Sequence, residues 1–230
     1  MLIEQLLESL RGGLIVSCQA PMGSPLADPH VISAMALTAE QHGAVGVRLN
    51  GPQHIAAARA RITVPIIGIE KVVTSDSDVY ITPTFAIAAR IARSGADIIA
   101  MDATQRLRPN GEGLENLLPA VRGELRKPVM ADVATFEEGL FAAECGADII
   151  ATTLCGYTKE TTGTSLPAFD LVERLADRLS LPVICEGGIA TPEDLRRAFD
   201  CGAFAVVVGT AITGITQLVK NFVTAVPRAS

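Results

Sequence analysis

Residues 94–104 read SGADIIAMDAT, a stretch in which a helix gives way to a strand. The early glycine can adopt the left-handed conformation that closes many helices. The apolar run that follows has no alternation with polar residues, which is typical of a strand buried on both faces of a parallel sheet. We therefore expect a helix that ends near Gly95 and a buried strand that ends at Asp102.

The same pattern recurs along the chain at intervals of about 50 residues. Its four copies are HGAVGVRLN at 42–50, SGADIIAMDAT at 94–104, CGADIIATTLC at 145–155 and CGAFAVVVGTAIT at 201–213. Four more strand-like runs lie before or between them: GLIVSCQ at 13–19, VPIIGIEK at 64–71, KPVMADV at 127–133 and LPVICEGG at 181–188. In three of these, a proline stands directly before the apolar residues, which suits the start of a strand.

Eight apolar runs, mostly separated by segments of helical periodicity, predict a (β/α)8 TIM barrel, a fold of about 250 residues. We expect one domain over residues 1–230, with a short helix at the N-terminus. An open doubly wound sheet is the runner-up, and the absence of an early GxGxxG motif after a strand disfavours it. A solenoid is also disfavoured, because each repeat holds two strand–helix modules, a quarter of a barrel.

Two helix starts support this register of strands and helices. Thr135 is followed by Glu138 in the spacing of a capping box, directly after the fifth strand. Thr191 is followed by Pro192 after the seventh strand, which places a cap residue before a proline at the first helical position.

Composition narrows the class of protein. The chain has 230 residues, a formal net charge of −6 and 49% hydrophobic residues, which suits a soluble globular domain of the cytoplasm. No apolar run approaches the ~20 residues of a membrane helix, and the acidic start does not resemble a signal peptide. The acidic balance argues against nucleic acid as a partner. Five cysteines without CxxC spacing predict reduced thiols, and no cluster has metal-ligand spacing.

Polar residues end most of the predicted strands, and in a barrel these ends form the active site. The third run ends in Glu70 and Lys71. Because side chains alternate along a strand, Lys71 faces the interior if the isoleucines two and four positions before it do, and Glu70 then faces outward. Glu186 ends the seventh run, across the mouth. An ammonium and a carboxylate around one cavity can share acid–base chemistry, and a structural salt bridge is the alternative.

Glycine-rich turns follow the last two strands, at Gly187-Gly188 and Gly209-Thr210. Barrels commonly bind phosphate at this place, through backbone N–H groups that glycine lets approach the anion. Tight turns without a ligand are the competing interpretation.

Much of the chain resembles the bacterial N-acetylmannosamine-6-phosphate 2-epimerases of sialic acid catabolism. The matching stretches, in order, are IVSCQA at 15–20, GAVGVRLNG at 43–51, PIIGIEK at 65–71, DSDVYITPT at 76–84, GADIIAMDATQRLRPNG at 95–111, MADVATFEEG at 130–139, TTLCGYT at 152–158, EGGIATPED at 186–194 and VVVGTAIT at 206–213. Other phosphate-binding barrels share only the GADII and glycine-turn features.

This resemblance implies a cofactor-independent barrel, often a homodimer, that acts on a small amino-sugar phosphate. It would interconvert N-acetylmannosamine 6-phosphate and N-acetylglucosamine 6-phosphate at C2. Family roles fall on Lys71 and Glu186 as the acid–base pair, on Gln19, Arg48 and Asp132 as sugar contacts, and on Gly187, Gly188, Gly209 and Thr210 as the phosphate cradle. The family commonly carries a basic residue directly after the AIT segment, where this chain has Gly214.

The chemistry of C2 agrees with this assignment, since a proton next to the C1 aldehyde of the open-chain sugar is acidic enough to be removed by a positioned base. Lys71 is the candidate base if burial lowers its pKa, Glu186 can return the proton or orient the lysine, and Arg48 or Gln19 can hold the oxygens. Two alternatives remain open at this point. Lys71 could form a Schiff base, as in lysine-dependent aldolases, or the chain could be a non-catalytic sugar-phosphate binder.

Overall fold

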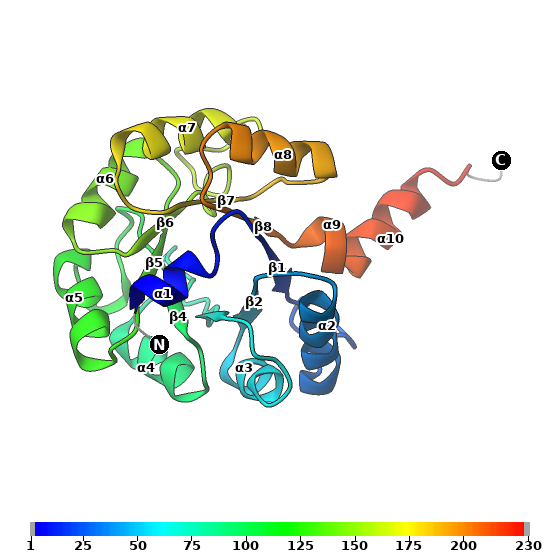
Figure 1. The fold of residues 1–230 in the computed structure, drawn as a ribbon, viewed down its shortest axis with the longest axis horizontal. Coiled ribbons are helices and arrows are strands. Elements are labelled where there is room, and N and C mark those ends of the chain that lie inside the picture. Colours follow the sequence, from blue (N-terminus) through cyan, green and yellow to red (C-terminus); the bar gives the residue numbers. More distant parts are fainter. Residues whose placement is uncertain (1–2, 228–230) are drawn as a thin grey trace.

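Eight parallel strands form a closed barrel in the computed structural model, which describes residues 3–227 (Figure 1). The strands are β1 (Leu14–Cys18), β2 (Gly46–Asn50), β3 (Ile66–Ile69), β4 (Ile98–Asp102), β5 (Val129–Asp132), β6 (Ile149–Ala151), β7 (Val183–Glu186) and β8 (Ala205–Val208). Each pairs with the next in chain order, and β8 closes on β1. The predicted (β/α)8 barrel is confirmed, and the doubly wound alternative is excluded.

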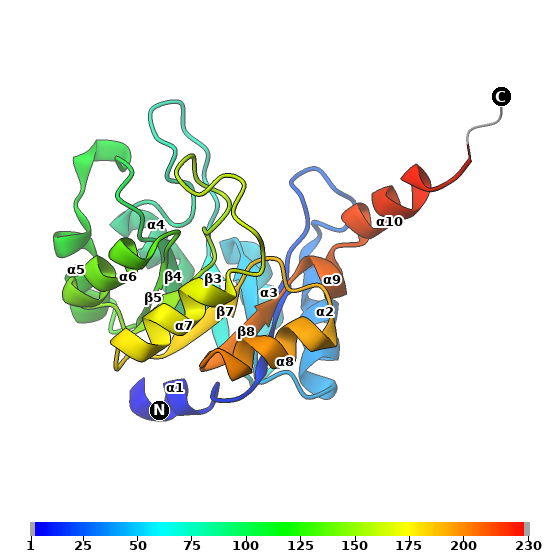
Figure 2. The same ribbon diagram turned by 90° about the horizontal axis from the view of Figure 1, so that it is seen from above.

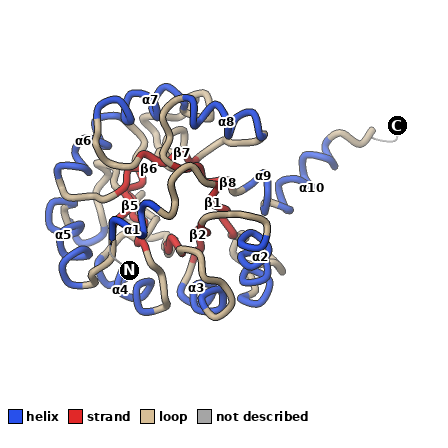
Figure 3. The backbone as a smooth tube through the Cα atoms, viewed as in Figure 1, coloured by secondary structure: helices blue, strands red, loops and turns tan. Residues whose placement is uncertain are grey.

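Helices form a ring outside the strands (Figure 3). The helices between consecutive strands are α2 (Pro29–Gln41), α3 (Pro52–Arg59), α4 (Phe85–Arg93), α5 (Leu114–Glu124), α6 (Phe136–Glu144), α7 (Phe169–Arg178) and α8 (Pro192–Asp200), with a short 3-10 turn, η1 (Pro109–Gly111), before α5. The expected N-terminal helix is α1 (Ile3–Glu8), and it lies at the end of the barrel opposite the long loops (Figure 2).

Alternation along the strands divides the core into two layers. Ile67, Ile69 and Met130 belong to the cluster inside the barrel, whereas their neighbours Ile66 and Val129 pack outward against the helices. Both layers are apolar, so the polar side chains at the strand ends stand apart from the core and are candidates for the site. The alternation also fixes which side chains can face the open mouth.

The predicted helix starts are both present. Thr135 and Glu138 form a complete capping box at the start of α6. Thr191 caps α8, with Pro192 as the first helical residue, and Asp194 completes a second capping box there. Caps of this kind stabilise a helix by about 1 kcal/mol, and they end the loops that lead away from β5 and β7.

The chain leaves the barrel after β8. The short helix α9 (Thr210–Thr213) is tied to β1, because the hydroxyl of Thr213 donates to the carbonyl of Ser17 at 2.7 Å. The last helix, α10 (Ile215–Thr224), then projects away from the ring rather than packing between α8 and α2 (Figures 1 and 2). A groove of about 560 Å³ remains on α2 and β1, with Leu14, Val31 and Met35 among its lining residues.

Candidate active site

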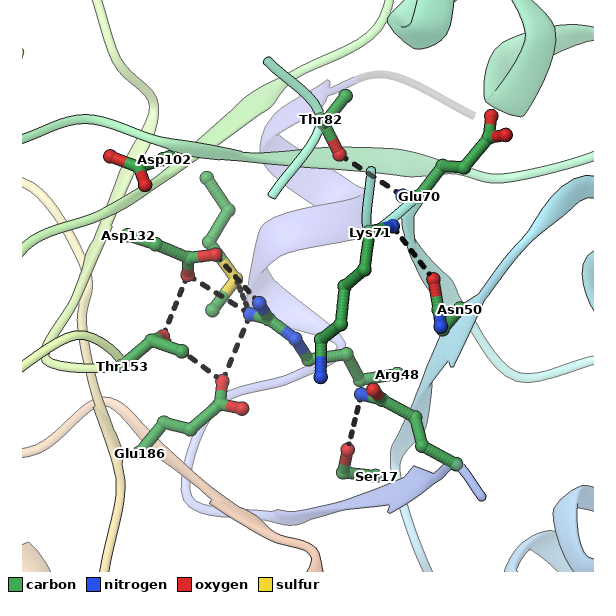
Figure 4. A network of polar contacts seen from close by, with 12 residues as sticks. Ser17, Arg48, Asn50, Glu70, Lys71, Thr82, Asp102, Asp132, Thr153 and Glu186 are labelled. Atoms are coloured by element: carbon green, nitrogen blue, oxygen red, sulfur yellow. Dashed lines mark hydrogen bonds and ion pairs between the residues drawn. The ribbon is translucent and has the colours of Figure 1, made fainter. Parts of the chain in front are cut away.

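Glu70 and Lys71 take opposite directions at the end of β3 (Figure 4). Glu70 forms an ion pair with Arg90 of α4, at 3.0 Å, in the helix layer. The side chain of Lys71 instead runs into the open end of the barrel, toward Arg48 and Glu186. The prediction that Lys71 faces the interior and Glu70 faces outward is therefore confirmed. The two charged side chains at the end of β3 lie in different parts of the barrel.

A small hairpin holds the backbone of Lys71. Its partner is Ile81, in an antiparallel bridge, and Val72 N–H donates to the carbonyl of Tyr80 at 2.9 Å. The N–H of Lys71 itself donates to Oδ1 of Asn50, the last residue of β2, at 2.9 Å. The loop after β3 thus folds back on the strand and fixes the origin of the lysine side chain.

Arg48 lies at the centre of a buried ion cluster. Its guanidinium contacts Asp132 at 2.6 Å and Glu186 at 2.9 Å, and its side chain is 1% exposed. Asp132 is fully buried, and Glu186 exposes 14% of its side chain. The hydroxyl of Thr153 lies 2.6 Å from Oδ1 of Asp132 and 3.2 Å from Oε2 of Glu186. Residues from β2, β5 and β7 and from the loop after β6 therefore meet in one network.

The surroundings of Lys71 lower the pKa of its ammonium group, as a catalytic base requires. Although solvent reaches it through the open mouth, the surrounding protein removes much of its hydration, and this lowers the pKa of its ammonium. The positive charge of Arg48 lowers the same pKa further, against the attraction of Glu186 and Asp132. A lower pKa increases the fraction of neutral amine at a working pH.

Glu186 is shifted in the opposite direction. Loss of hydration raises the pKa of its carboxyl group, and the charge of Asp132 adds to this, while Arg48 opposes both. The two residues on opposite sides of the barrel thus have pKa values that approach each other. Perturbed pKa values of this kind cluster at functional sites, where burial and neighbouring charges are arranged around the reacting groups.

The remaining predicted site residues surround the same open end. Gln19 follows β1 and donates from Nε2 to the hydroxyl of Ser17 at 2.8 Å. Gly188 has φ +76°, and a Cβ there would lie 2.5 Å from Cβ of Leu166, so the turn after β7 requires glycine. Gly209 and Thr210 follow β8, the neighbour of β7 in the barrel.

Gly214 is the position at which the family resemblance leads us to expect a basic residue. A Cβ at this position would lie 2.6 Å from the carbonyl oxygen of Thr210. The backbone between α9 and α10 is therefore fitted to glycine, and position 214 offers no side chain to an anion.

Burial and pKa indicate that the two cysteines near the mouth have a structural role in the core. Cys18 and Cys185 are free and buried. Burial raises the pKa of each thiol to about 12, so neither is a thiolate near neutral pH. The free state of both cysteines agrees with the expectation of reduced thiols.

Asn50 and Thr153 had no place among the predicted site residues, although Asn50 ends β2 and Thr153 lies just after β6. The side chain of Asn50 accepts a hydrogen bond from the backbone N–H of Lys71, and the hydroxyl of Thr153 lies within hydrogen-bond distance of two carboxylates. Such partnerships join residues far apart in the chain, so periodicity cannot reveal them. Their position, at the end of β2 and directly beyond β6, is the signal that could have marked them.

Residues 3–227 contain neither a candidate metal site nor a candidate membrane helix. No group of three or more His, Cys, Asp or Glu side chains in this range is arranged to hold a metal ion. In the same range, no helix has both the length and the apolar character needed to cross a bilayer.

A closed barrel with a lysine and a carboxylate on opposite sides of its open end defines a barrel enzyme with acid–base groups at the strand ends. The chain belongs to the N-acetylmannosamine-6-phosphate epimerase family: the family model described as "Putative N-acetylmannosamine-6-phosphate epimerase" matches residues 32–228.

Individual relatives agree with this assignment. A protein of Synechococcus elongatus named "Putative N-acetylmannosamine-6-phosphate 2-epimerase" is 53% identical, over 96% of this chain and 97% of its own length. A protein of Cutibacterium acnes with the same name is 45% identical, over 95% and 96%. The solved structure of the N-acetylmannosamine-6-phosphate 2-epimerase from Clostridium perfringens superposes with a TM-score of 0.92, at 40% identity and 96% coverage of both chains.

Proposed function

We propose that this protein interconverts N-acetylmannosamine 6-phosphate and N-acetylglucosamine 6-phosphate by removing and returning the proton at C2. The observation that carries the proposal is the placement of Lys71 and Glu186 across one open end of the barrel, where the side chain of Lys71 runs toward Glu186. The directions of their pKa shifts support it. Family membership supplies the substrate class, and it does not favour the Schiff-base or non-catalytic alternatives.

The first step uses Lys71 as the base. The neutral amine takes the proton from C2 of the open-chain sugar, and the electron pair of the C–H bond forms a double bond to C1. The C1 carbonyl oxygen takes up negative charge as an enolate. Donors aimed at that oxygen stabilise the transition state, and we assign this task to Gln19 and Arg48.

The second step uses Glu186 as the acid. Its carboxyl group gives a proton to the opposite face of C2, the enolate collapses to the aldehyde, and the configuration at C2 is inverted. In the reverse direction, the Glu186 carboxylate removes the proton and the Lys71 ammonium returns one. The pair holds one proton in either resting state, so a cycle leaves the enzyme unchanged after exchange with water. No metal ion or organic cofactor takes part in these steps.

Other residues bind the substrate in this scheme. Asp132 binds a sugar hydroxyl or assists ring opening, although the structure also commits its carboxylate to Arg48 and Thr153. The backbone N–H groups of Gly187, Gly188, Gly209 and Thr210 receive the phosphate. Because position 214 has no basic side chain, we infer that these N–H groups and the start of α9 provide most of the phosphate affinity.

The test is turnover of purified protein in the presence of EDTA, without added metal or nucleotide. Proton NMR should show the gluco epimer growing from N-acetylmannosamine 6-phosphate to a fixed equilibrium ratio. Unphosphorylated N-acetylmannosamine serves as the matched substrate and should react more slowly. If neither sugar reacts with folded protein, the proposed reaction is wrong.

We also propose that the protein acts in the cytoplasm, as one domain over residues 1–230, and as a homodimer. The support for a dimer is the apolar face of α10, where Ile215, Val219, Phe222 and Val223 are 46% to 79% exposed. These positions follow the i, i+4, i+7, i+8 spacing of a helix that packs on one side. No residue of α10, which lies wholly within the described range, is buried in its own chain.

A second copy of the chain is the occupant that fits the groove on α2 and β1. In a (β/α)8 barrel, the helix after β8 packs beside β8 and β1, between the helices that follow β7 and β1. Here α9 covers only part of that place, and α10 points away from it (Figure 1). The α10 helix of a second chain would fill the apolar groove, in the place that the helix after β8 usually takes in its own barrel. In a symmetric dimer, each chain would place its α10 in the groove of the other.

A further inference from the structure

Two consecutive threonines after β6 hold Glu186 by different parts of the residue. The hydroxyl of Thr152 donates to the carbonyl of Glu186 at 3.0 Å and accepts from its N–H at 3.1 Å. The hydroxyl of Thr153 lies 3.2 Å from Oε2 of Glu186. Thr152 therefore fixes the backbone of Glu186, whereas Thr153 contacts its carboxyl group.

The two oxygens of the Glu186 carboxyl group are not equivalent. Oε2 lies 2.9 Å from Nη1 of Arg48 and faces the Thr153 hydroxyl. A guanidinium has donors only, so a proton on Oε2 would meet the N–H of Arg48 head-on. Oε1 has no hydrogen-bond partner within residues 3–227, and Figure 4 shows it on the side of the Lys71 ammonium.

We propose that Thr153 is a positioning residue of the epimerase, which with Arg48 holds Oε2 of Glu186 so that Oε1 carries the proton and faces C2 of the substrate. This inference rests on the proposed role of Glu186 as the acid. The hydroxyl also lies 2.6 Å from Oδ1 of Asp132, so its single proton is shared between the two carboxylates of the cluster and can be donated to either one. Without its hydroxyl, the carboxyl group of Glu186 could rotate about its last bond and present either oxygen.

The surroundings of Glu186 give the direction of the expected pH effect. The charged groups that face it are Arg48 from β2, Lys71 after β3 and Asp132 from β5. The Thr153 hydroxyl favours the ionised form of Glu186, so its removal raises the pKa of that carboxyl group further. Below this pKa, Lys71 and Glu186 are both protonated and no base remains. The acid limb of the pH–rate profile should therefore move to higher pH.

The experiment compares Thr153→Val with Thr153→Ser, using Thr152→Val as the matched control. For each variant, kcat and KM are measured across pH in both directions, together with the melting temperature. For Thr153→Val we expect kcat to fall about ten- to hundredfold, with little change in KM, because a hydrogen bond to an ionisable group is lost. Its acid limb should move to higher pH, in the direction that loss of the Thr153 hydrogen bond gives.

The control variants separate positioning from simple structural support. Thr153→Ser keeps the hydroxyl and should restore both kcat and the acid limb. Thr152→Val loses backbone contacts and should lower the melting temperature while the acid limb stays in place. The inference is overturned if folded Thr153→Val keeps the wild-type acid limb, or if Thr153→Ser does not restore it. Glu186→Gln tests the underlying role separately: full activity in that variant would remove Glu186, and with it this inference.

Discussion

The guanidinium of Arg48 and the carboxylate of Asp132 meet as a two-point ion pair, with Nη2 2.6 Å from Oδ2 and Nη1 3.0 Å from Oδ1. Neither side chain exposes more than 1% of its surface. Two charges held so deeply are stable only with each other, because each alone would have lost its hydration without compensation. The pair therefore belongs to the floor of the site, and it positions Glu186 above it.

Loss of Arg48 should damage folding as well as activity. We expect Arg48→Met to lower the free energy of unfolding by about 3–5 kcal/mol, because it leaves Asp132 buried and unpaired. Denaturant unfolding measures the change. The double variant Arg48→Met with Asp132→Leu should recover most of the stability and remain inactive. A single variant that unfolds at the wild-type denaturant concentration would contradict the importance of this ion pair.

The pH dependence of kcat/KM should be bell-shaped. Activity requires one proton on the Lys71–Glu186 pair, so it is lost at low pH when both groups are protonated and at high pH when neither is. Because the pKa of Glu186 is raised, the acid limb should lie above 4.5, and because that of Lys71 is lowered, the alkaline limb should lie below 10.5. A rate that rises steadily to an alkaline plateau would show that Glu186 is not needed as an acid.

Adjacent residues 70 and 71 offer a matched pair of substitutions. We expect Lys71→Ala to lower kcat about 10²- to 10⁴-fold without loss of stability, since it removes the base. Glu70→Gln breaks only a partly exposed ion pair with Arg90, so it should cost less than about 1 kcal/mol of stability and little activity. Steady-state kinetics of both variants measure the change in kcat, and thermal melts measure the change in stability. Equal effects on kcat would refute the opposite orientations of the two side chains.

The dimer proposal predicts a mass of twice the 24.1 kDa chain in solution. Phe222→Asp should shift the protein toward monomer, because it places a charge in the centre of the apolar face of α10. Lys220→Glu changes charge on the same helix outside that face and should remain dimeric. Light scattering across a dilution series measures both variants. A wild-type monomer at all concentrations would exclude the exchange of α10.

Much of the barrel could be predicted from the sequence because its signals are local. Each glycine-closed helix is followed by an apolar run, and the alternation along residues 66–71 correctly separated Glu70 from Lys71. The order of strands then placed Glu186 across the mouth, because β3 and β7 lie four strands apart in a closed barrel of eight.

The remaining features depend on contacts that no local pattern records. The cluster of Arg48, Asp132, Thr153 and Glu186 joins three strands and the loop after β6, and its burial depends on how tightly the barrel closes around it. The direction of α10 also depends on contacts that no local sequence pattern records. Its apolar stripe predicts that it packs on something, but only the fold shows that its own barrel does not supply the partner.

The most direct test of proton transfer between Lys71 and Glu186 is proton NMR of the reaction in heavy water, starting from N-acetylmannosamine 6-phosphate. With bases on opposite faces, the N-acetylglucosamine 6-phosphate formed at early times should carry deuterium at C2, while the remaining substrate keeps its proton. Lys71→Ala should show neither product nor exchange. Product that retains the original proton at C2, or turnover that survives the loss of Lys71, would contradict the mechanism.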